Sequence, residues 1–247
     1  MISQRSDNAP LVREENSLKN KVILLTGASK GLGYALSEAF AEEGARLVLL
    51  SRSIEKEAQK DDVLALCVDV SDPSQVCQVV NMAISRFGKI DVLINNAALC
   101  GPFQLFQEHT VEAISHQIDV NLKGPMYFMQ AVLPVMINQG GGDILNINSV
   151  AGKQIYPYCS VYSATKFALD AVTRTIAEEQ RPNNIRVMSI YPGRIDTPMW
   201  GEIEPNTLQD PLKMLSVIEV CKAILVMLKQ PREVEIRELV IAPTHCD

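Results

Sequence analysis

Short apolar runs rich in β-branched residues alternate along this chain with longer stretches whose apolar positions recur every three or four residues. The four-residue runs that begin at Val22 and at Leu47 are apolar throughout, which is typical of strands buried on both faces of a parallel sheet. The longer stretches have the periodicity of amphipathic helices. Strands are therefore predicted over residues 21–26, 45–50, 63–68, 90–95, 143–148, 185–191 and 236–242.

Helix-start signals lie between these strands. Asp72 followed by Pro73 predicts a helix start, because proline fits the first helical turn. Ser216 and Glu219 have the spacing of a capping box at the start of the last helical stretch. Strands and helices that alternate without a linker predict an α/β fold, a doubly wound parallel sheet of seven strands with helices on both faces. We expect one domain, residues 19–247, after a flexible tail, residues 1–18.

Composition and charge narrow the classes of partner. The net charge of −6 argues against nucleic-acid and anionic-membrane partners, which favour a basic surface. Cysteines 67, 77, 100, 159, 221 and 246 lie singly in apolar stretches, without the spacing of a zinc site or a disulfide framework. The N-terminus lacks the apolar segment of a signal peptide, and no apolar run reaches the length of a membrane span. We therefore expect a cytoplasmic protein with reduced thiols and no metal site.

A glycine-rich turn joins the first predicted strand to a helical stretch. Gly27, Gly31 and Gly33 lie in this turn, together with Ser29, Lys30 and Leu32. Glycines permit close approach of the backbone to a pyrophosphate, and the helix behind them offers N–H groups and the positive end of its dipole. Because a strand precedes the turn and a helix follows it, a dinucleotide-phosphate loop is favoured over a plain loop.

The Gly-x-x-x-Gly-x-Gly spacing of this turn resembles that of the short-chain dehydrogenase/reductase family. The resemblance covers nearly the whole chain from about Ser17 onward. It implies a three-layer Rossmann-type sandwich with the strand order 3-2-1-4-5-6-7. It also implies an oxidoreductase that moves hydride between a nicotinamide cofactor and a small carbonyl/alcohol pair.

Further cofactor contacts are implied by this resemblance. Asp69 and Val70 resemble the family's adenine-contacting position. The run Asn-Asn-Ala-Ala resembles the family's Asn-Asn-Ala-Gly motif, in which Asn95 and Ala97 are the expected contacts. Ala98 stands where the family usually has glycine, which puts the local turn geometry in doubt.

The end of the second strand distinguishes the two nicotinamide cofactors. In such folds an acid there binds the ribose hydroxyls and repels a 2′-phosphate. Ser51 and Arg52 follow the strand instead, and Arg52 and Lys30 are predicted to bind a 2′-phosphate. NADP(H) is therefore preferred, unless both cations are ordinary surface charges. Glu55 and Glu57 lie close enough in sequence to keep NAD(H) as the alternative.

Three polar side chains are predicted to meet at the carboxyl edge of the sheet. Tyr162 and Lys166 lie four residues apart on one helix face, and Ser149 ends a predicted strand. Tyr162 is the expected general acid/base, Ser149 the group that orients the substrate oxygen, and Lys166 the charge that lowers the Tyr162 pKa. The family resemblance adds Asn121, which is implied to hold Lys166 through water, and gives Lys166 a second role as a ribose ligand.

The segment after the sixth strand, Pro-Gly-x-x-x-Thr, resembles the family's nicotinamide-contacting segment. The alternative is an ordinary turn. The full set of expected cofactor contacts is Gly27, Ser29, Lys30, Gly31, Leu32, Gly33, Ser51, Arg52, Asp69, Val70, Asn95, Ala97, Tyr162, Lys166, Pro192, Gly193, Ile195 and Thr197.

The substrate is less well defined than the cofactor. Its expected contacts are Val150, Ala151, Tyr156, Cys159 and Trp200. The short segment over residues 200–215 argues against a large multi-ring substrate. The Pro-Thr ending of the last strand resembles reductases of 3-hydroxy acids and small aldehydes, and the Thr-Pro-Met-Trp-Gly run resembles bacterial sepiapterin reductases. A 3-hydroxy acid, a pteridine ketone and a small aldehyde all remain open.

Other functions fit parts of the pattern. Sugar-nucleotide epimerases and dehydratases share the Tyr-x-x-x-Lys pair, but they resemble longer chains with a C-terminal substrate domain. A catalytically silent NADP(H)-binding sensor or scaffold needs no proton donor such as Tyr162. The helices expected around residues 125–138 and 160–179 resemble those that pair subunits in the family. A homodimer or homotetramer is therefore expected, unless their apolar residues all face the sheet.

Overall fold

The computed structural model describes residues 17–54, 61–199 and 213–244 of the 247-residue chain. Seven strands form one parallel sheet in the order β3-β2-β1-β4-β5-β6-β7. The elements are β1 (Val22–Thr26), α1 (Gly31–Glu42), β2 (Arg46–Ser51), β3 (Val63–Cys67), α2 (Pro73–Phe87), β4 (Val92–Asn95), η2 (Phe106–Glu108), α3 (Val111–Ile118), η3 (Asp119–Lys123), α4 (Gly124–Asn138), β5 (Gly142–Ile147), η4 (Val150–Gly152), α5 (Ser160–Gln180), η5 (Arg181–Asn183), β6 (Ile185–Pro192), α7 (Val217–Leu228) and β7 (Glu238–Ile241). All seven predicted strands and the expected strand order are confirmed.

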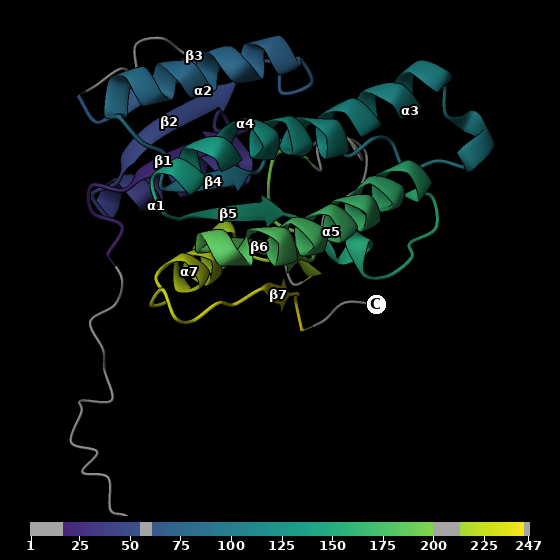
Figure 1. The fold of residues 1–247 in the computed structure, drawn as a ribbon. Coiled ribbons are helices and arrows are strands. Elements are labelled where there is room, and N and C mark those ends of the chain that lie inside the picture. Colours follow the sequence, from purple (N-terminus) through teal and green to yellow (C-terminus); the bar gives the residue numbers. More distant parts are fainter. Residues whose placement is uncertain (1–16, 55–60, 200–212, 245–247) are drawn as a thin grey trace, which may run out of the picture.

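Helices cover both faces of the sheet (Figure 1). On one face, Val76 of α2, Phe128 of α4 and Leu169 of α5 belong to one buried cluster with the strands. On the other face, Phe40 of α1 and Ile224 of α7 belong to a second cluster. The predicted doubly wound, three-layer arrangement is therefore confirmed, and burial of both sheet faces explains the continuously apolar strands.

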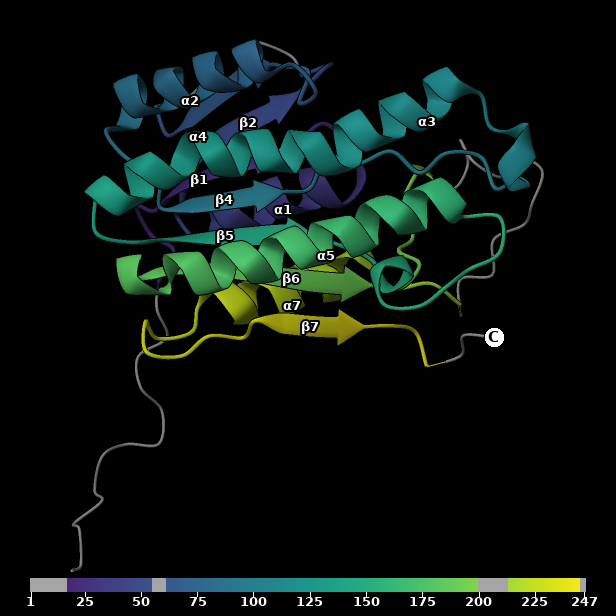
Figure 2. The ribbon, with the colours of Figure 1, turned by 45° about the vertical axis from the view of Figure 1, so that its right-hand side comes forward.

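The carboxyl ends of the parallel strands lie along one edge of the sheet, as Figure 2 shows by the direction of the arrows. The strand order reverses between β1 and β4, because β1 is followed in sequence by β2 on one side and lies beside β4 on the other. Ligands of open α/β sheets bind outside the carboxyl ends at such a reversal. The turn after β1 begins at this point.

Side-chain caps fix the starts of two helices. Asp72 accepts hydrogen bonds from the backbone N–H groups of Ser74 (2.8 Å) and Gln75 (3.3 Å), as its predicted capping role requires. Ser216 accepts from the Ile218 N–H (3.2 Å), but the Glu219 carboxylate pairs with Lys222 at 2.8 Å. The predicted capping box therefore forms only in part.

The first described residues contact the domain close to the boundary expected between tail and domain. Leu18, the last residue of the expected tail, is buried in the core. Asn20 donates its backbone N–H to the Gly44 carbonyl at 2.8 Å. Ser17 is also described, whereas residues 1–16 of the expected tail lie outside the described residues.

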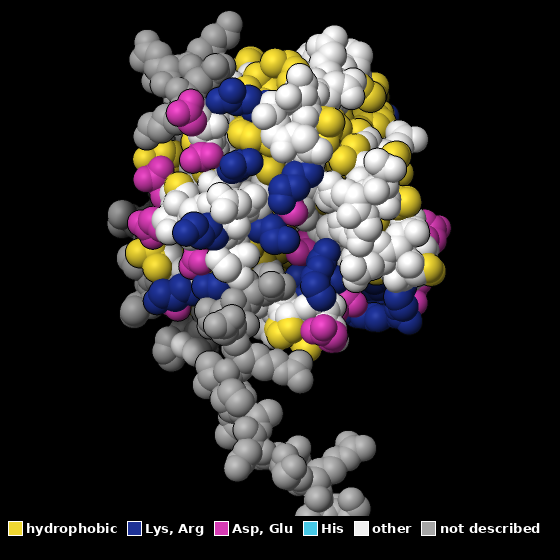
Figure 3. Space-filling view, turned by 60° about the vertical axis from the view of Figure 1, so that its left-hand side comes forward, with side chains coloured by type: hydrophobic (Ala, Val, Ile, Leu, Met, Phe, Trp, Pro, Cys, Tyr) yellow, Lys and Arg dark blue, Asp and Glu magenta, His cyan; other side chains and the backbone are white. Residues whose placement is uncertain are grey.

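Lys and Arg side chains gather near the amino ends of the strands, with Asp and Glu among them (Figure 3). Lys21 and Lys89 both pair with Asp91, at 3.5 and 2.9 Å, and Arg46 pairs with Asp62 at 3.4 Å. These cations each face an acid, so this surface is of mixed charge. Within the described ranges, no helix combines the length and the apolar character needed to cross a membrane.

Candidate active site

A cleft of about 1160 Å³ opens at the carboxyl ends of the strands. Its walls come from the glycine-rich turn, the segments after β2 to β6, and the first turns of α5. The expected cofactor contacts that line it are Gly27, Ser29, Lys30, Gly31, Leu32, Gly33, Ser51, Arg52, Asp69, Val70, Ala97, Tyr162, Lys166, Pro192, Gly193, Ile195 and Thr197. Sequence reasoning therefore located the cleft from segments spread over the chain.

The glycine-rich turn brings backbone close to backbone. Gly27 and Gly31 have φ values of +68° and +57°, a region that favours glycine. A Cβ on Gly33 would stand 2.0 Å from the Gly27 carbonyl oxygen, so a side chain there cannot be accommodated. Helix α1 begins at Gly31 without a side-chain cap from Lys30. Its first N–H groups, which have no partner within the helix, lie at the cleft.

Asn95 is an exception among the expected contacts. Its side chain is buried, donates to Asn146 Oδ1 at 2.8 Å and is not a wall residue of the cleft, so its expected contact with the cofactor stays a prediction. The neighbouring Asn96 lines the cleft and donates through Nδ2 to the Thr26 and Gly27 carbonyls, at 2.9 and 3.1 Å. Because successive side chains at a strand end point in opposite directions, the two asparagines have different roles.

Arg52 and Asp69 form the far end of the cleft. Arg52 is exposed, and its charge helps to lower the Asp69 pKa. The larger causes of that lowering are two hydrogen bonds that Asp69 accepts from Ser71, from Oγ at 2.6 Å and from N–H at 2.9 Å. The Arg52 cation and the ionised Asp69 carboxylate therefore lie at the same end of the cleft. Glu55 and Glu57 lie outside the described residues.

Ser149, Tyr162 and Lys166 come together in the middle of the cleft. Ser149 follows β5 and caps η4, accepting from the Ala151 N–H at 3.1 Å. Its hydroxyl also hydrogen-bonds the Tyr162 side chain. Lys166 Nζ lies 5.6 Å from the centroid of the Tyr162 ring and donates to the Ile147 carbonyl at 2.8 Å.

Burial controls the protonation of this group. The pKa of Tyr162 is raised by burial, which outweighs the opposing hydrogen bond from Ser149. That Lys166 stabilises a Tyr162 phenolate stays a prediction, because burial is the largest influence on this pKa. Burial also lowers the pKa of Lys166 to about 8, which weakens the ammonium as a source of stabilisation for a phenolate.

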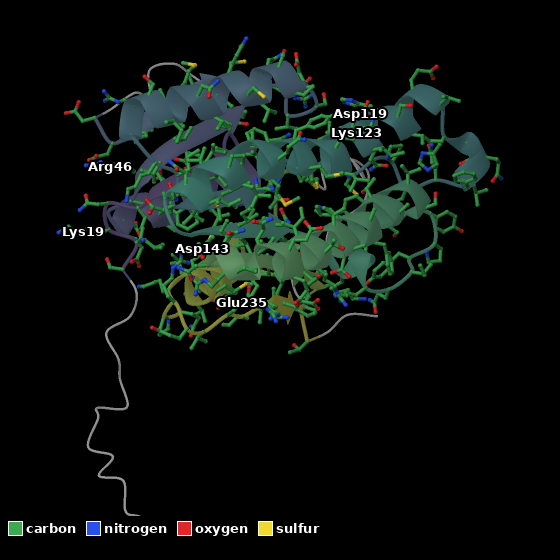
Figure 4. All side chains as sticks on the ribbon, viewed as in Figure 1. Lys19, Arg46, Asp119, Lys123, Asp143 and Glu235 are labelled. Carbon is green, nitrogen blue, oxygen red and sulfur yellow. The ribbon has the colours of Figure 1, made fainter. Side chains whose placement is uncertain are left out.

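Asn121 lies on η3, a π-helical turn between α3 and α4, where Asp119 and Lys123 form an ion pair of 2.8 Å (Figure 4). Its side chain is buried rather than part of the cleft wall, and Nδ2 donates to Thr165 Oγ1 at 3.3 Å. A water-mediated link from Asn121 to Lys166 stays a prediction.

Two amides hold the wall segment that follows β4. Asn121 accepts from the Leu99 N–H and donates to the Leu99 carbonyl, both at 2.7 Å. Gln117, which sequence reasoning did not identify, donates to the same carbonyl at 3.1 Å. Gln117 lies four residues before Asn121 in a helical stretch. This spacing places both amides on one helix face, and it could have identified Gln117 from the sequence.

Asn148 is a second residue that sequence reasoning missed. It accepts from the Ser149 N–H at 2.9 Å and donates to the Lys166 carbonyl at 3.2 Å. A Cβ on Gly152 would stand 2.7 Å from its Oδ1. Asn148 therefore connects Ser149 to the helix that carries Tyr162. Its position as a polar residue in an apolar predicted strand could have identified it from the sequence.

The segment after β6 closes the opposite wall. Thr197 lies against the glycine-rich turn, where a Cβ on Gly31 would meet its Cβ at 3.4 Å. Ile195 forms a bridge with Leu215, and the Asp196 N–H donates to the Leu215 carbonyl at 2.9 Å. This Pro-Gly segment is therefore part of the cleft wall.

The expected substrate contacts form a further part of the cleft wall. The expected substrate contacts Val150, Ala151, Tyr156 and Cys159 line it, whereas Trp200 lies outside the described residues. Further wall residues that the sequence analysis did not assign to the substrate are Cys100, Phe103, Gln154, Pro157, Tyr158 and Met199.

Comparisons with known proteins agree with this geometry. Residues 21–208 match the family described as short chain dehydrogenase. An uncharacterised oxidoreductase of Staphylococcus saprophyticus is 34% identical over 235 residues, which cover 92% of this chain and 98% of that protein. An uncharacterised oxidoreductase of Staphylococcus aureus is 32% identical over 232 residues, again 92% of this chain and 98% of the relative.

Solved structures extend the similarity to proteins with cofactors. An alcohol dehydrogenase from the archaeon Thermococcus sibiricus, complexed with 5-hydroxy-NADP, has a TM-score of 0.82 and 30% identity, covering 93% of this chain and 99% of that one. A 3-ketoacyl-(acyl-carrier-protein) reductase from Brucella melitensis, complexed with NADH, has a TM-score of 0.84 and 28% identity, covering 92% and 99%.

Proposed function

Because this chain belongs to the short-chain dehydrogenase/reductase family of oxidoreductases, we propose that it moves hydride between NADP(H) and a small ketone or aldehyde and its alcohol. The observation that carries the proposal is the meeting of Ser149, Tyr162 and Lys166 in one cleft with the glycine-rich turn. A proton donor, a second hydroxyl and a cation then surround the position of a reacting carbonyl.

The glycine-rich turn has the form that a dinucleotide diphosphate requires. Gly33 leaves the space in which a Cβ would clash with the Gly27 carbonyl. The uncapped start of α1 directs N–H groups and the positive end of the helix dipole to the same place. Gly27, Gly31, Leu32 and Gly33 would therefore hold the diphosphate, and the bound nicotinamide supplies the hydride.

Preference for NADP(H) is proposed from the charges at the adenine end. Arg52 and Lys30 both line the cleft and would bind a 2′-phosphate, Arg52 through a bidentate fork. The Thermococcus and Brucella proteins are complexed with an NADP derivative and with NADH respectively. The similarity alone therefore leaves the cofactor open, and Arg52 is the residue that supports NADP(H).

Tyr162 is proposed as the general acid in the direction of reduction. As hydride reaches the carbonyl carbon, negative charge develops on the oxygen, and Tyr162 Oη–H donates a proton to it. Ser149 Oγ–H donates a second hydrogen bond that fixes the oxygen before transfer. In the oxidative direction the same Tyr162 oxygen takes the alcohol proton, with the Lys166 ammonium stabilising the phenolate.

A panel of carbonyl compounds tests the proposed activity. The purified protein is incubated with NADPH or NADH and sepiapterin, 3-oxo acids, α-diketones or short aldehydes, and cofactor oxidation is followed by absorbance. Turnover of one compound with NADPH is the expected result, and that compound identifies the substrate class. Saturable NADPH binding without turnover of any member would favour a cofactor-binding sensor instead.

Replacement of Tyr162 by Phe tests the assigned acid. We expect kcat to fall by about 10²- to 10⁴-fold, the usual contribution of a positioned acid, while the Kd for NADPH stays within about twofold. Tyr34→Phe is the matched control, because Tyr34 is exposed on α1 and is not a wall residue of the cleft. A fully active Tyr162→Phe variant would remove the mechanism.

A further inference from the structure

An exposed apolar rim borders the substrate end of the cleft. It consists of Leu105, Phe106, Ile155 and Tyr158, whose exposed fractions are 46%, 65%, 77% and 56%. Isolated exposed apolar residues are common on protein surfaces, but a group of them at one site marks binding. This group comes from two segments that are about fifty residues apart in the chain, so their meeting is a feature of the fold.

Backbone contacts join the two segments of the rim. The Gln104 N–H donates to the Tyr158 carbonyl at 3.3 Å, which places η2 beside the turn before α5. Tyr158 has a φ of +66°, a rare conformation for a residue with a side chain. Strained backbone of this kind concentrates at functional sites. The Tyr158 side chain is therefore held at this place by its surroundings.

The rim is continuous with the interior of the cleft. Tyr158 belongs both to the rim and to the cleft wall. The wall residue Pro157 directly precedes Tyr158, and the wall residue Phe103 lies two residues before Leu105. Cys159 of the same wall lies close enough to Tyr162 to raise its pKa. An apolar path therefore leads from the surface to the proposed acid.

Three polar side chains of these segments, Gln154, Tyr156 and Glu108, form hydrogen bonds within the segments. Gln154 donates to the Tyr156 hydroxyl, and the Glu108 carboxylate accepts from the Leu105 N–H at 3.0 Å. Residues 100–108 and 154–159 contain no Lys, Arg or His. These two segments thus offer no Lys or Arg to a carboxylate on the distal part of a substrate. The His109 ring lies 6.5 Å from the Phe106 ring, and Arg194 and Lys213 line other parts of the cleft.

We infer that the substrate carries an extended apolar group, alkyl or aryl, next to its reacting carbonyl, and that this group leaves the cleft across Leu105, Phe106, Ile155 and Tyr158. The inference rests on the proposed carbonyl reduction for the position of the reacting group. It assigns the rim to substrate rather than to a second copy of the chain, because the rim continues into the cleft.

A homologous series of methyl ketones tests this inference. Affinities of 2-butanone, 2-hexanone, 2-octanone and 2-decanone are measured by calorimetry on the protein saturated with NADP⁺, where no turnover takes place. Burial of each methylene is expected to raise affinity about two- to fourfold. From 2-hexanone to 2-decanone the wild-type affinity should therefore rise roughly 50-fold.

Variants separate the rim from the rest of the surface. In Phe106→Ser/Ile155→Ser the increase from 2-hexanone to 2-decanone should shrink below about fivefold, whereas affinity for 2-butanone stays the same. Both side chains are mostly exposed, so the fold should tolerate their loss. Ile218→Ser on α7, with a 63% exposed side chain, is the control and should keep the wild-type increase.

Two kinds of outcome would overturn the inference. The first is found in the affinities: either the wild-type affinity does not change with chain length, or the rim variant shows the same increase as the wild type. The other is a rim variant whose sedimenting mass falls while the chain-length effect stays, which would assign the rim to a contact between copies. Failure of NADPH oxidation with every ketone would contradict the proposed reduction alone, because the calorimetric series does not depend on turnover.

Discussion

Lys166 is a cation with almost no access to water, and its burial has a consequence for pH dependence. Its pKa falls from 10.5 to about 8, so the ammonium is lost as the pH rises through that value. The Tyr162 pKa is raised by burial, so its proton stays in place over the same interval. We therefore predict that the proposed reductase activity is lost at alkaline pH, and that Lys166 is the group whose deprotonation causes the loss.

A pH profile tests this assignment. We expect kcat/KM for reduction to decline above pH about 8. In Lys166→Arg the guanidinium stays charged, so the decline should disappear even though the overall rate is lower. Circular dichroism over the same pH range controls for unfolding. A decline that persists unchanged in Lys166→Arg would assign the limb to Tyr162 instead.

Arg52 carries the proposed preference for NADP(H). In Arg52→Ala the Kd for NADPH should rise about tenfold or more, because a charge-assisted hydrogen bond to phosphate is lost, whereas the Kd for NADH changes little. Arg181→Ala is the matched control, since Arg181 is exposed beyond the C-terminal end of α5. Fluorescence titration of the wild type and both variants with each cofactor gives the six dissociation constants. Equal losses for both cofactors would contradict the assignment.

At the scale of elements, α2 depends on its cap. Asp72 accepts hydrogen bonds from the side chains of Ser74 (2.6 Å) and Gln75 (2.9 Å) as well as from their backbone N–H groups, and those bonds lower its pKa from 3.8 to about 2. Because the folded state favours the ionised form, the cap stabilises the fold above pH about 4. That contribution is lost as the pH falls toward 2.

Replacing Asp72 by Ala should lower the melting temperature by about 2–4 °C at pH 7, the usual effect of a lost cap in a chain of this size. Asp72→Asn keeps an acceptor and should lose less. Melting curves at several pH values check the cause, since the difference between wild type and Asp72→Ala should shrink below pH about 4. A difference that is independent of pH would point to packing instead.

At the scale of the whole molecule, α4 and α5 each carry apolar residues that are buried against the sheet and apolar residues that are exposed. Phe128 and Leu169 are buried against the sheet, but Met126 and Phe167 are about 40% exposed. The alternative in which all apolar residues of these helices face the sheet is therefore wrong. The exposed residues support the expected association of subunits through this face.

Sedimentation velocity at micromolar concentration should give the mass of a dimer or tetramer. Met126→Glu/Phe167→Glu should lower that mass, because charges in an apolar contact are costly to bury. Tyr34→Glu, at an exposed position on α1, is the control that should leave the mass unchanged. A monomeric wild type would contradict the expectation of a homo-oligomer.

The pattern of apolar residues determined the seven strands and the layers, because burial on both faces leaves continuous apolar runs that can be read locally. Local chemistry also located the glycine-rich turn and the positions of Ser149, Tyr162 and Lys166. Only the tertiary structure decided that Asn96 rather than Asn95 faces the cleft, and that burial raises the Tyr162 pKa. It alone brought Gln104 into contact with Tyr158. Side-chain direction, solvent exposure and contacts between distant segments depend on neighbours from other elements, which no local pattern specifies.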